Sequence, residues 1–435
     1  MPDLSFLNFN LNFSSIWAFF SQPPQLILWD VFIYGGWVII LILLISGFWN
    51  YWLMRVRKKF LASMQYILLT IDVPKNNEQG PEAVERLFAQ LAGTRSSGSK
   101  IDVYFKGYVQ PDFSFELVSL EGKIRYFIRI PVQFRDMIEA AIYSAYHDAE
   151  IMEAEDYVTE IPDIFPNDEY DCWISDLILY NKDFYPIRTY PEFEHSLSKE
   201  LKDPLGVLWE LMGKLGAGEH LWTQLIVTPI NNDWKKRADN FVKKMLGIKI
   251  PVQKNVGDYL IGGLSAMGTA LSTGGTAEKK EEKKEAINLS PGEKKGLEAI
   301  QEKTSKLGFK VKYRAVYVAR KEVFFKNRGV VGFLGSINQF NTLDLNGFKP
   351  DDQAKTSKPM LFGARRLAKK QMRLMHAYKT RSRFIGAKNF VLNTEELATL
   401  YHFPAANIKT GATIRLVQKT GSKRGEPPIR LPLVQ

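Results

Sequence analysis

The stretch that most constrains this chain is residues 31–54, which contain no charged side chain (VFIYGGWVIILILLISGFWNYWLM). A helix of that length is about 36 Å long, slightly more than the ~30 Å hydrocarbon core of a bilayer. Aromatic residues gather at both ends, as expected where a helix meets two lipid–water interfaces. A signal peptide has a shorter apolar run, and its positive charge comes first. The stretch therefore predicts a single transmembrane helix.

The charges around this stretch are asymmetric. Residues 1–30 contain no Lys or Arg, whereas Arg55, Arg57, Lys58 and Lys59 follow the apolar run directly. Basic residues next to a membrane helix favour the cytoplasmic side. We therefore expect a protein of the cytoplasmic (plasma) membrane that crosses it once. Residues 1–30 would be an extracytoplasmic segment, and the bulk of the chain would be cytoplasmic.

Chemistry-bearing residues are few and scattered. The single cysteine, Cys172, excludes an internal disulfide and fits a reducing compartment. The five histidines form no HxxxH pair, and no CxxC pair occurs. There is no phosphate-binding P-loop, no dinucleotide-binding glycine motif, no GxSxG and no HExxH. We therefore expect no catalytic residue, no metal and no cofactor, and a protein that is not an enzyme.

Residues 60–160 predict a ferredoxin-like αβ domain. The apolar periodicity changes from strand-like to helical and back in the order β-α-β-β-α-β, which is that of a split βαβ unit. A Glu121-Gly122 turn between two alternating runs predicts a hairpin. The expected elements are strands near 66–73, 113–117, 124–130 and 150–155, and helices at 81–92 and from Pro131 to about Ala145.

Residues 161–345 predict a second αβ domain with a flexible insertion at 250–290. The insertion is rich in Gly, Ser, Thr and Ala and then reads EKKEEKKE, a composition typical of linkers. A loop that touches a membrane is the alternative for its uncharged part. The domain mixes strands and packed helices, so a second ferredoxin-like unit interrupted by the insertion would explain it.

Acidic residues are concentrated in residues 153–176. Paired carboxylates suit general acid–base chemistry or a hard cation. Pro162 and Pro166 interrupt the segment, however, and nothing in the pattern fixes two carboxylates on one rigid face. A solvated connector is the favoured interpretation, and the catalytic alternative stays open.

Most of the net charge of +11 comes from the C-terminal region, residues 346–435. From residue 351 onward it holds 17 Lys and Arg against five Asp and Glu. Residues 361–378 predict an amphipathic helix, and its like charges at i and i+4 repel by a few tenths of a kcal/mol each. An anionic partner would relieve that repulsion. The candidate binding residues are Arg365, Arg366, Lys369, Lys370, Arg373, Lys379, Arg381, Arg383 and Lys388.

Three interpretations of this basic region remain open. Nucleic acid would be bound through its phosphates without sequence specificity, because no helix-turn-helix, zinc-finger or ribonucleoprotein motif is present. Anionic lipid of the inner leaflet is an equally simple partner for a tethered protein. Many charged runs are merely solvated surface.

Four stretches together resemble a known family: YFIRIPVQFRDMIEAAIYSAYHDAEI (126–151), YPIRTYPEFE (185–194), DPLGVLWELMGKLGAGEHLWTQLIVTP (203–229) and NTEELATLYHFP (393–404). They are similar to a membrane-anchored bacterial family of unknown function, and the likeness covers most of residues 60–404. Members are found beside, or fused in front of, conjugative-transfer ATPases of the FtsK–HerA type, the TraG-like coupling proteins of type IV secretion. In fused members a segment similar to residues 393–404 leads into the nucleotide-binding domain, so the resemblance implies a separate ATPase subunit here.

The expected fold class is α+β: an N-terminal single transmembrane helix, ferredoxin-like αβ units, and a basic, mainly helical C-terminal region. The expected function is a single-pass membrane component of a type IV secretion-like or conjugation-like machine for DNA or protein. It would act as a non-catalytic anchor or as the partner of a separate ATPase. The expected partners are the membrane, an FtsK–HerA-type ATPase, nucleic acid and further copies of the chain. The alternative is a membrane-tethered scaffold that binds anionic lipid or protein.

Overall fold

The structure is a computed structural model, and the parts of the chain that it describes lie in two compact units. The described residues are 37–74, 77–193, 203–248, 289–357 and 363–405, with a few isolated positions before residue 37. The predicted extracytoplasmic segment (1–30) and flexible insertion (250–290) lie almost entirely outside them. The first unit takes residues 1–65 and 97–109, and the second takes residues 66–96 and 110–435.

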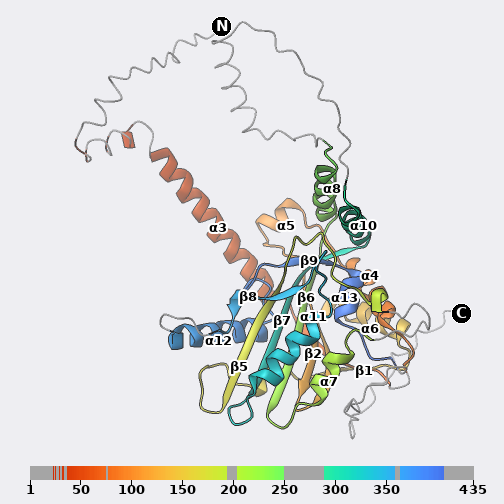
Figure 1. The fold of residues 1–435 in the computed structure, drawn as a ribbon. Helices are drawn as coiled ribbons and strands as arrows, with labels where there is room; N and C mark the ends of the chain where they lie inside the picture. Colours follow the sequence, from red (N-terminus) through yellow and green to blue (C-terminus); the bar gives the residue numbers. More distant parts are fainter. Residues whose placement is uncertain are drawn as a thin grey trace, which may run out of the picture. The chain divides into compact units, whose positions relative to one another are not determined.

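The first unit contains a long helix, α3 (Trp37–Ser63), and a short one, α5 (Lys100–Tyr104) (Figure 1). A capping box starts α5, since Ser99 and Asp102 exchange side-chain and backbone hydrogen bonds. The rings of Trp49 and Tyr104 contact each other with centroids 6.0 Å apart.

The prediction of a transmembrane helix at residues 31–54 is wrong. In the part of the chain that the structure describes, no helix is long and apolar enough to cross a bilayer. The described helix begins at Trp37 instead of Val31, and it continues without a break beyond Met54 to Ser63. Asn50 and the basic residues from Arg55 onward therefore share one helix with the apolar run. The predicted fold class is incorrect in its membrane anchor, whereas its α+β character is confirmed.

Nine described strands of the second unit form one antiparallel sheet in the order β4-β1-β3-β2-β6-β7-β5-β8, and β9 pairs with β7. Figure 1 shows the strands side by side. Their bounds are β1 (Tyr66–Asp72), β2 (Phe113–Leu120), β3 (Lys123–Pro131), β4 (Glu150–Glu153), β5 (Tyr170–Leu179), β6 (Glu219–Pro229), β7 (Gly308–Arg320), β8 (Phe348–Lys355) and β9 (Phe390–Asn393).

The sheet consists of two ferredoxin-like halves. The first runs β1-α4-β2-β3-α6-β4 and the second β5-α7-β6-β7-α11-β8, and in each half the strands lie in the spatial order 4-1-3-2. The halves meet through their second strands, because β2 pairs with β6. The predicted order of elements in residues 60–160 is therefore observed. The helices are α4 (Pro81–Ala92), α6 (Arg135–Ala145), α7 (Gly206–Gly213) and α11 (Gly332–Asn338).

Further helices interrupt or follow the second half. Helices α8 (Asp233–Met245) and α10 (Pro291–Ser305) come between β6 and β7 and pack against each other through a small apolar cluster that includes Val242 and Ile300. Helix α12 (Gly363–Lys379) follows β8, and α13 (Thr394–Leu400) follows β9. Both α10 and α13 begin with the capping boxes that their sequences encode.

The predicted hairpin between β2 and β3 turns at Glu121 and Gly122, whose φ angles are 52° and 84°. Two positive φ angles match the twist of the flanking strands. Gly122 is required for a second reason, because a Cβ there would lie 2.6 Å from the carbonyl oxygen of Leu215.

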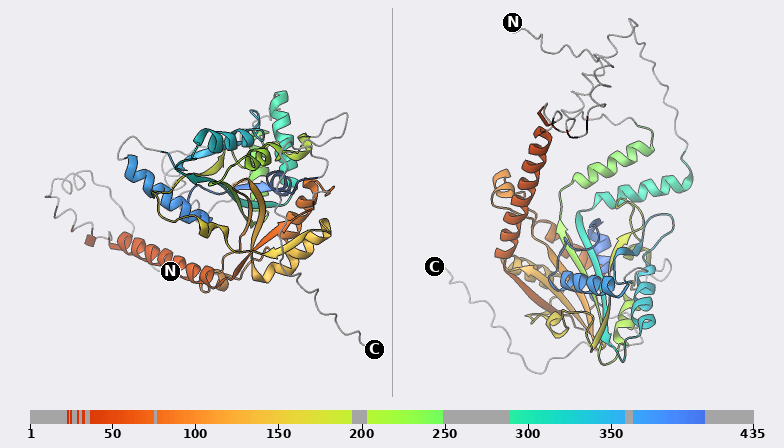
Figure 2. Two further views of the ribbon diagram at one scale, coloured as in Figure 1. Left: turned by 90° about the horizontal axis from the view of Figure 1, so that it is seen from below. Right: turned by 90° about the vertical axis from the view of Figure 1, so that its left-hand side faces the viewer.

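The two faces of the sheet carry different layers, because side chains alternate along each strand. Odd-numbered residues of β2 and β7, such as Phe115 and Tyr313, face the core below α4, α6, α7, α11 and α13. The opposite face, called the back face here, is covered by α12 and by residues 154–166, including the short helix η4 (Tyr157–Glu160). The right-hand view of Figure 2 shows α12, in blue, crossing the strands.

Residues 154–166 are therefore more than the solvated connector that the sequence favoured. Tyr157, Val158, Ile161 and Phe165 are buried in the back core, while most of the acidic side chains between them face outward.

Candidate functional site

One side of α12 exposes a row of cations. Arg365, Arg366, Lys369 and Arg373 are exposed and define what we call the α12 basic face. Arg365, Lys369 and Arg373 follow one another at i, i+4 and i+8, which places them along one ridge about 12 Å long. No carboxylate of the described residues lies within 4.0 Å of these four side chains. The predicted basic helix thus presents unpaired positive charge.

The opposite side of α12 is fixed to the back face. Leu374, Met375 and Tyr378 are buried in the back core. Gln371 donates hydrogen bonds from Nε2 to Asp171 Oδ1 (3.0 Å) and to the carbonyl oxygen of Cys172 (3.2 Å). Lys370 lies between the two sides, half-buried, with its ammonium 3.4 Å from the carbonyl oxygen of Asp352.

The remaining predicted binding residues do not share this face. Lys388 is exposed, but Lys379 pairs with Asp163 at 2.5 Å. Arg383 lies 3.7 Å from Asp112 and donates to Thr228 Oγ1 at 2.9 Å. Arg381 is buried. Three of the nine side chains are therefore occupied inside the protein.

Arg381 belongs to a chain of polar groups on the back face that we call the buried row. The row consists of Asp176 on β5, Arg314 on β7, Gln224 on β6 and Glu116 on β2, all fully buried. Each residue is the direct cross-strand partner of the next. Arg314 Nε donates to Asp176 Oδ1 at 2.6 Å, and Gln224 Nε2 donates to Glu116 Oε1 at 2.9 Å. A line of polar side chains thus runs across four adjacent strands on the back face, which is otherwise apolar.

Arg381 completes the row at Glu116. Its Nε and Nη2 lie 3.0 and 3.1 Å from the two carboxylate oxygens, and Asp156 also binds the guanidinium. Burial alone would lower the pKa of Arg381, but Glu116 and Asp156 outweigh it and raise that pKa. Burial opposes ionisation of Glu116, yet Arg381 and donated hydrogen bonds hold its pKa below the ordinary value. Both groups are therefore charged.

The row also holds the loop that follows α12. Arg314 donates to the carbonyl oxygens of Ala377 (2.7 Å) and Ile385 (2.9 Å). Lys312 Nζ donates to those of Ile385 and Ala387, each at 2.7 Å. Asp176 accepts from the backbone N–H of Ala387 at 2.7 Å.

Two backbone conformations show how closely this loop follows the sheet. Gly386 has a φ of +100°, and a Cβ there would lie 1.9 Å from Asp176 Oδ2, so only glycine fits. Arg381 has a φ of +50°, a left-handed conformation that costs on the order of 1–3 kcal/mol for a side-chain-bearing residue. The buried row stabilises this conformation through the Arg381 guanidinium.

The charges of the buried row and of its neighbours Lys312 and Asp156 balance, which suits a structural role. Three cations (Lys312, Arg314 and Arg381) and three carboxylates (Asp156, Asp176 and Glu116) meet, so the cluster is neutral overall. Five of the six side chains are buried, and only Asp156 is partly exposed. The row was not predicted from the sequence. Each of the four strands carries one charged or amide residue among its alternating apolar positions. That pattern is the signal in the sequence that indicates such a row.

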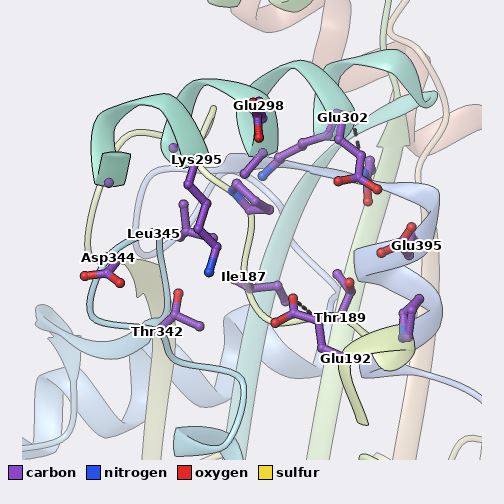
Figure 3. A pocket seen from close by; sticks show the side chains of 17 residues that line it. Ile187, Thr189, Glu192, Lys295, Glu298, Glu302, Thr342, Asp344, Leu345 and Glu395 are labelled. Carbon is purple, nitrogen blue, oxygen red and sulfur yellow. Dashed lines mark hydrogen bonds between the residues drawn. The ribbon is translucent and has the colours of Figure 1, made fainter. Parts of the chain in front are cut away.

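A pocket of about 550 Å³ lies beneath α10 (Figure 3). Its walls come from α10, from residues 186–192, from residues 342–345 and from the start of α13. Figure 3 shows Glu302 and Glu395 towards one end, Lys295 and Asp344 towards the other, and Glu192 between the two ends.

A buried ion pair holds the pocket walls together. Lys303 Nζ lies 3.0 Å from Glu396 Oε1, and both side chains are fully buried. Lys303 also donates to the carbonyl oxygens of Tyr185 and Val391, and Glu396 accepts from the N–H of Ile187 at 3.0 Å. Burial raises the pKa of Glu396, against the opposing effect of Lys303. Helix α10, the 185–187 segment and α13 therefore form one rigid frame.

Metal ligands are not gathered anywhere in the described parts of the chain: no three His, Cys, Asp or Glu side chains are placed to hold an ion. Cys172 is buried, and burial raises the pKa of its thiol far above the ordinary value, so it is not a reactive thiolate.

Comparison with known proteins places the chain in a family. Residues 64–414 match the family model described as "Domain of unknown function (DUF8128)", so the chain belongs to that family. No curated protein sequence matches it.

Arg381→Met tests the buried row. The substitution leaves Glu116 charged and buried without its cation, so we expect a loss of about 3–5 kcal/mol in the free energy of unfolding. Urea denaturation of the full chain measures it. Arg373→Met on the α12 basic face is the matched control, with an expected change within about 0.5 kcal/mol. Equal effects of the two substitutions would show that Arg381 has no special structural role.

Lys312 makes stability depend on pH. Burial lowers its pKa from 10.5 to about 8, although Asp176 partly offsets this. Between these values the unfolded chain binds the extra proton, so this group makes the folded state more stable as pH rises from 8 to 10.5. Relative to Lys312→Met, the wild type should gain on the order of 1–3 kcal/mol across this window. Lys310→Met, at an exposed position on β7, should show no such change, and a constant difference for Lys312→Met would contradict the assignment.

Proposed function

We propose that this member of the DUF8128 family is a non-catalytic component of a conjugation-like or type IV secretion-like translocation machine. In this proposal the α12 basic face binds the phosphates of DNA, and a separate FtsK–HerA-type ATPase supplies the work. The observation that carries the proposal is the ridge of exposed cations formed by Arg365, Lys369 and Arg373, which pair with no carboxylate of the described residues.

The ridge has the properties of a phosphate-binding surface. Guanidinium and ammonium groups bind phosphate oxygens through charge-assisted hydrogen bonds. A ridge of about 12 Å follows two or three consecutive phosphates of one strand, since phosphates along a B-DNA strand are spaced by 3.4 Å of axial rise and displaced around the helix. The buried row fixes the opposite side of α12, so little conformational entropy is lost when the cations meet DNA. Contacts of this kind are independent of base sequence.

The ATPase part of the proposal rests on the resemblance of residues 393–404 and of three other stretches to proteins that accompany TraG-like ATPases. In the fold these twelve residues belong to α13 and its flanks. Asn393 caps the helix, Thr394 Oγ1 donates to Glu85 Oε1 at 3.1 Å, and His402 Nε2 lies 3.0 Å from Asp203 Oδ1. The segment is thus integrated into the domain, which suits a rigid platform for an ATPase.

Salt-dependent DNA binding tests the proposal. Fluorescence anisotropy with a labelled duplex of arbitrary sequence should show binding whose logarithm falls linearly with the logarithm of salt concentration. Replacing Arg365, Lys369 and Arg373 together by Gln should reduce the magnitude of that slope by about 2.7, because each lost phosphate contact removes about 0.9.

The matched control removes three exposed cations from α8 by Lys235→Gln, Lys243→Gln and Lys244→Gln. The control should keep the wild-type slope. If it lowers the slope as much as the α12 variant does, binding reflects net charge alone and the assignment of α12 fails. If the intact chain neither binds DNA at low salt nor co-purifies with the FtsK–HerA-type ATPase of its own genome, the proposed function fails.

A second candidate function is a scaffold bound to the surface of an anionic bilayer. The observation that favours it is the exposed apolar surface of the first unit. Ile40, Leu43 and Phe48 on α3 are 51%, 66% and 67% exposed, and Ile101 and Phe105 at α5 are each 63% exposed. The four exposed basic residues at 55–59 lie next to this surface, and a polybasic cluster beside apolar groups suits anionic headgroups.

Vesicle sedimentation tests this second function. The intact protein should bind vesicles of phosphatidylcholine mixed with phosphatidylglycerol more strongly than pure phosphatidylcholine. Replacing Arg55, Arg57, Lys58 and Lys59 by Gln should abolish the preference, because each basic residue near an anionic surface contributes about 1 kcal/mol. The α8 variant above should keep it. Equal binding to both kinds of vesicle by the wild type would exclude a role for these charges.

A further inference from the structure

The loop that follows α12, residues 380–389, presents one aromatic ring to solvent. Phe384 is 68% exposed, and it is the one exposed apolar side chain of this loop, every residue of which the structure describes. A single exposed apolar side chain needs no function by itself. Phe384 differs from such a residue in the support of its backbone and in the charges beside its ring.

The backbone on both sides of this ring is fixed by the sheet. On one side, the carbonyl oxygen of Ile385 accepts hydrogen bonds from Lys312 Nζ at 2.7 Å and from Arg314 Nη2 at 2.9 Å. On the other side, Arg383 Nη1 donates to Thr228 Oγ1 on β6 at 2.9 Å. The ring is therefore held in place before any partner arrives, so little conformational entropy is lost when a partner binds.

Positive charge is in excess around the ring. The Arg383 guanidinium lies over the ring, with its central carbon 5.0 Å from the ring centroid. Lys310 on β7 is exposed, and it is the direct cross-strand partner of Thr228, to which Arg383 donates. Asp112 is the one carboxylate of the described residues within 4.0 Å of Arg383, at 3.7 Å. Two cations thus face one carboxylate, and the ring face away from Arg383 is open to solvent.

The loop is continuous with the α12 basic face. Burial lowers the pKa of Lys312, and the nearby positive charge of Arg373 adds to that effect, so the last cation of the ridge lies close to Lys312. Lys312 in turn donates to the carbonyl oxygens of Ile385 and Ala387. The ridge of cations on α12 therefore leads to the loop that carries Phe384.

The chemistry of this surface suits a single strand of nucleic acid. An unpaired base stacks on an exposed aromatic face while cations contact the phosphates on either side of it. A duplex keeps its bases stacked inside, so the ring would meet a base only by unstacking a base step. A bilayer is matched less well, because a single ring offers little apolar area and Ile385 beside it is half-buried.

Building on the proposed function, we propose that Phe384 is a stacking platform for an unpaired base of single-stranded DNA. The base lies on the ring face opposite Arg383. The phosphates on either side of it are bound by Arg383 and Lys310, and those further along the strand by Arg373 and the rest of the α12 basic face. The proposed function names only phosphates as ligands, and this inference adds that the bound form is single-stranded.

Fluorescence anisotropy of the full chain with labelled oligothymidylate, and with a labelled duplex of the same length, tests the proposal. Phe384→Ala should weaken binding of the single strand about tenfold, because the stacking of one base on an aromatic ring is lost. Its salt dependence should stay that of the wild type, because no cation is removed. The affinity for the duplex should stay unchanged. Phe384→Trp keeps an aromatic face and should bind the single strand at least as tightly as the wild type.

The matched control is Phe325→Ala, which removes a ring that is 58% exposed beyond the other end of β7. It should bind both probes like the wild type, and the melting temperatures of both alanine variants should stay unchanged because the rings are exposed. If the intact chain binds DNA but Phe384→Ala binds the single strand like the wild type, this inference fails and the proposed function stands.

Three other results overturn the inference. An equal loss of duplex affinity in Phe384→Ala would make the ring a wedge between base pairs. A loss of binding to anionic vesicles, with single-strand binding intact, would assign the ring to a bilayer. Absence of any DNA binding by the intact chain would also overturn it, and co-purification with the ATPase would then decide the proposed function separately.

Discussion

Arg314 is fully buried at the centre of β7, and the position of α12 depends on it. Its guanidinium donates to Asp176, to the last turn of α12 at Ala377 and to the following loop at Ile385. A charge in this position costs several kcal/mol in lost hydration, and only a complete set of partners offsets that cost. Any displacement of α12 along the sheet would break those hydrogen bonds together. The basic helix is therefore fixed by directional bonds as well as by apolar packing, which alone would permit sliding.

The same row joins the two halves of the sheet. Gln224 belongs to the second half and Glu116 to the first, and they are direct partners across the β2–β6 junction. A slip of one residue at this junction would turn Glu116 toward the core below α4 and Phe115 toward the back face. Such a slip would bury an unpaired carboxylate in an apolar layer. The buried row thus specifies the register at the point where two otherwise similar halves have to be aligned.

Local patterns in the sequence determined much of the fold. The helix at 81–92, the turn at Glu121-Gly122 and the two capping boxes depend on neighbouring residues, so they were predictable. The single continuous sheet was not, because pairing of β2 with β6 joins residues about a hundred positions apart. The prediction of a transmembrane helix at 31–54 was wrong for a different reason. Its composition is that of a membrane helix, but the described helix starts later and includes Asn50 and the basic residues beyond Met54.

The basic residues proposed to bind an anionic partner also show what local sequence patterns could not predict. Arg373 and Arg381 are eight residues apart in a basic stretch, and composition gives no reason to separate them. In the fold Arg373 is solvated, whereas Arg381 is paired with Glu116, a residue 265 positions away in sequence.

This division between exposed and buried cations has an energetic consequence. The repulsion along Arg365, Lys369 and Arg373 costs only a few tenths of a kcal/mol per pair, which is small beside the packing and hydrogen bonds on the other side of α12. The internal cations thus hold the helix in place, and the exposed ones form no ion pair within the part of the chain that the structure describes. The carboxylates beneath α10 are likewise arranged around a frame held by Lys303 and Glu396. In both places buried ion pairs hold the surrounding elements in position, and the charged side chains at the surface lie on that frame.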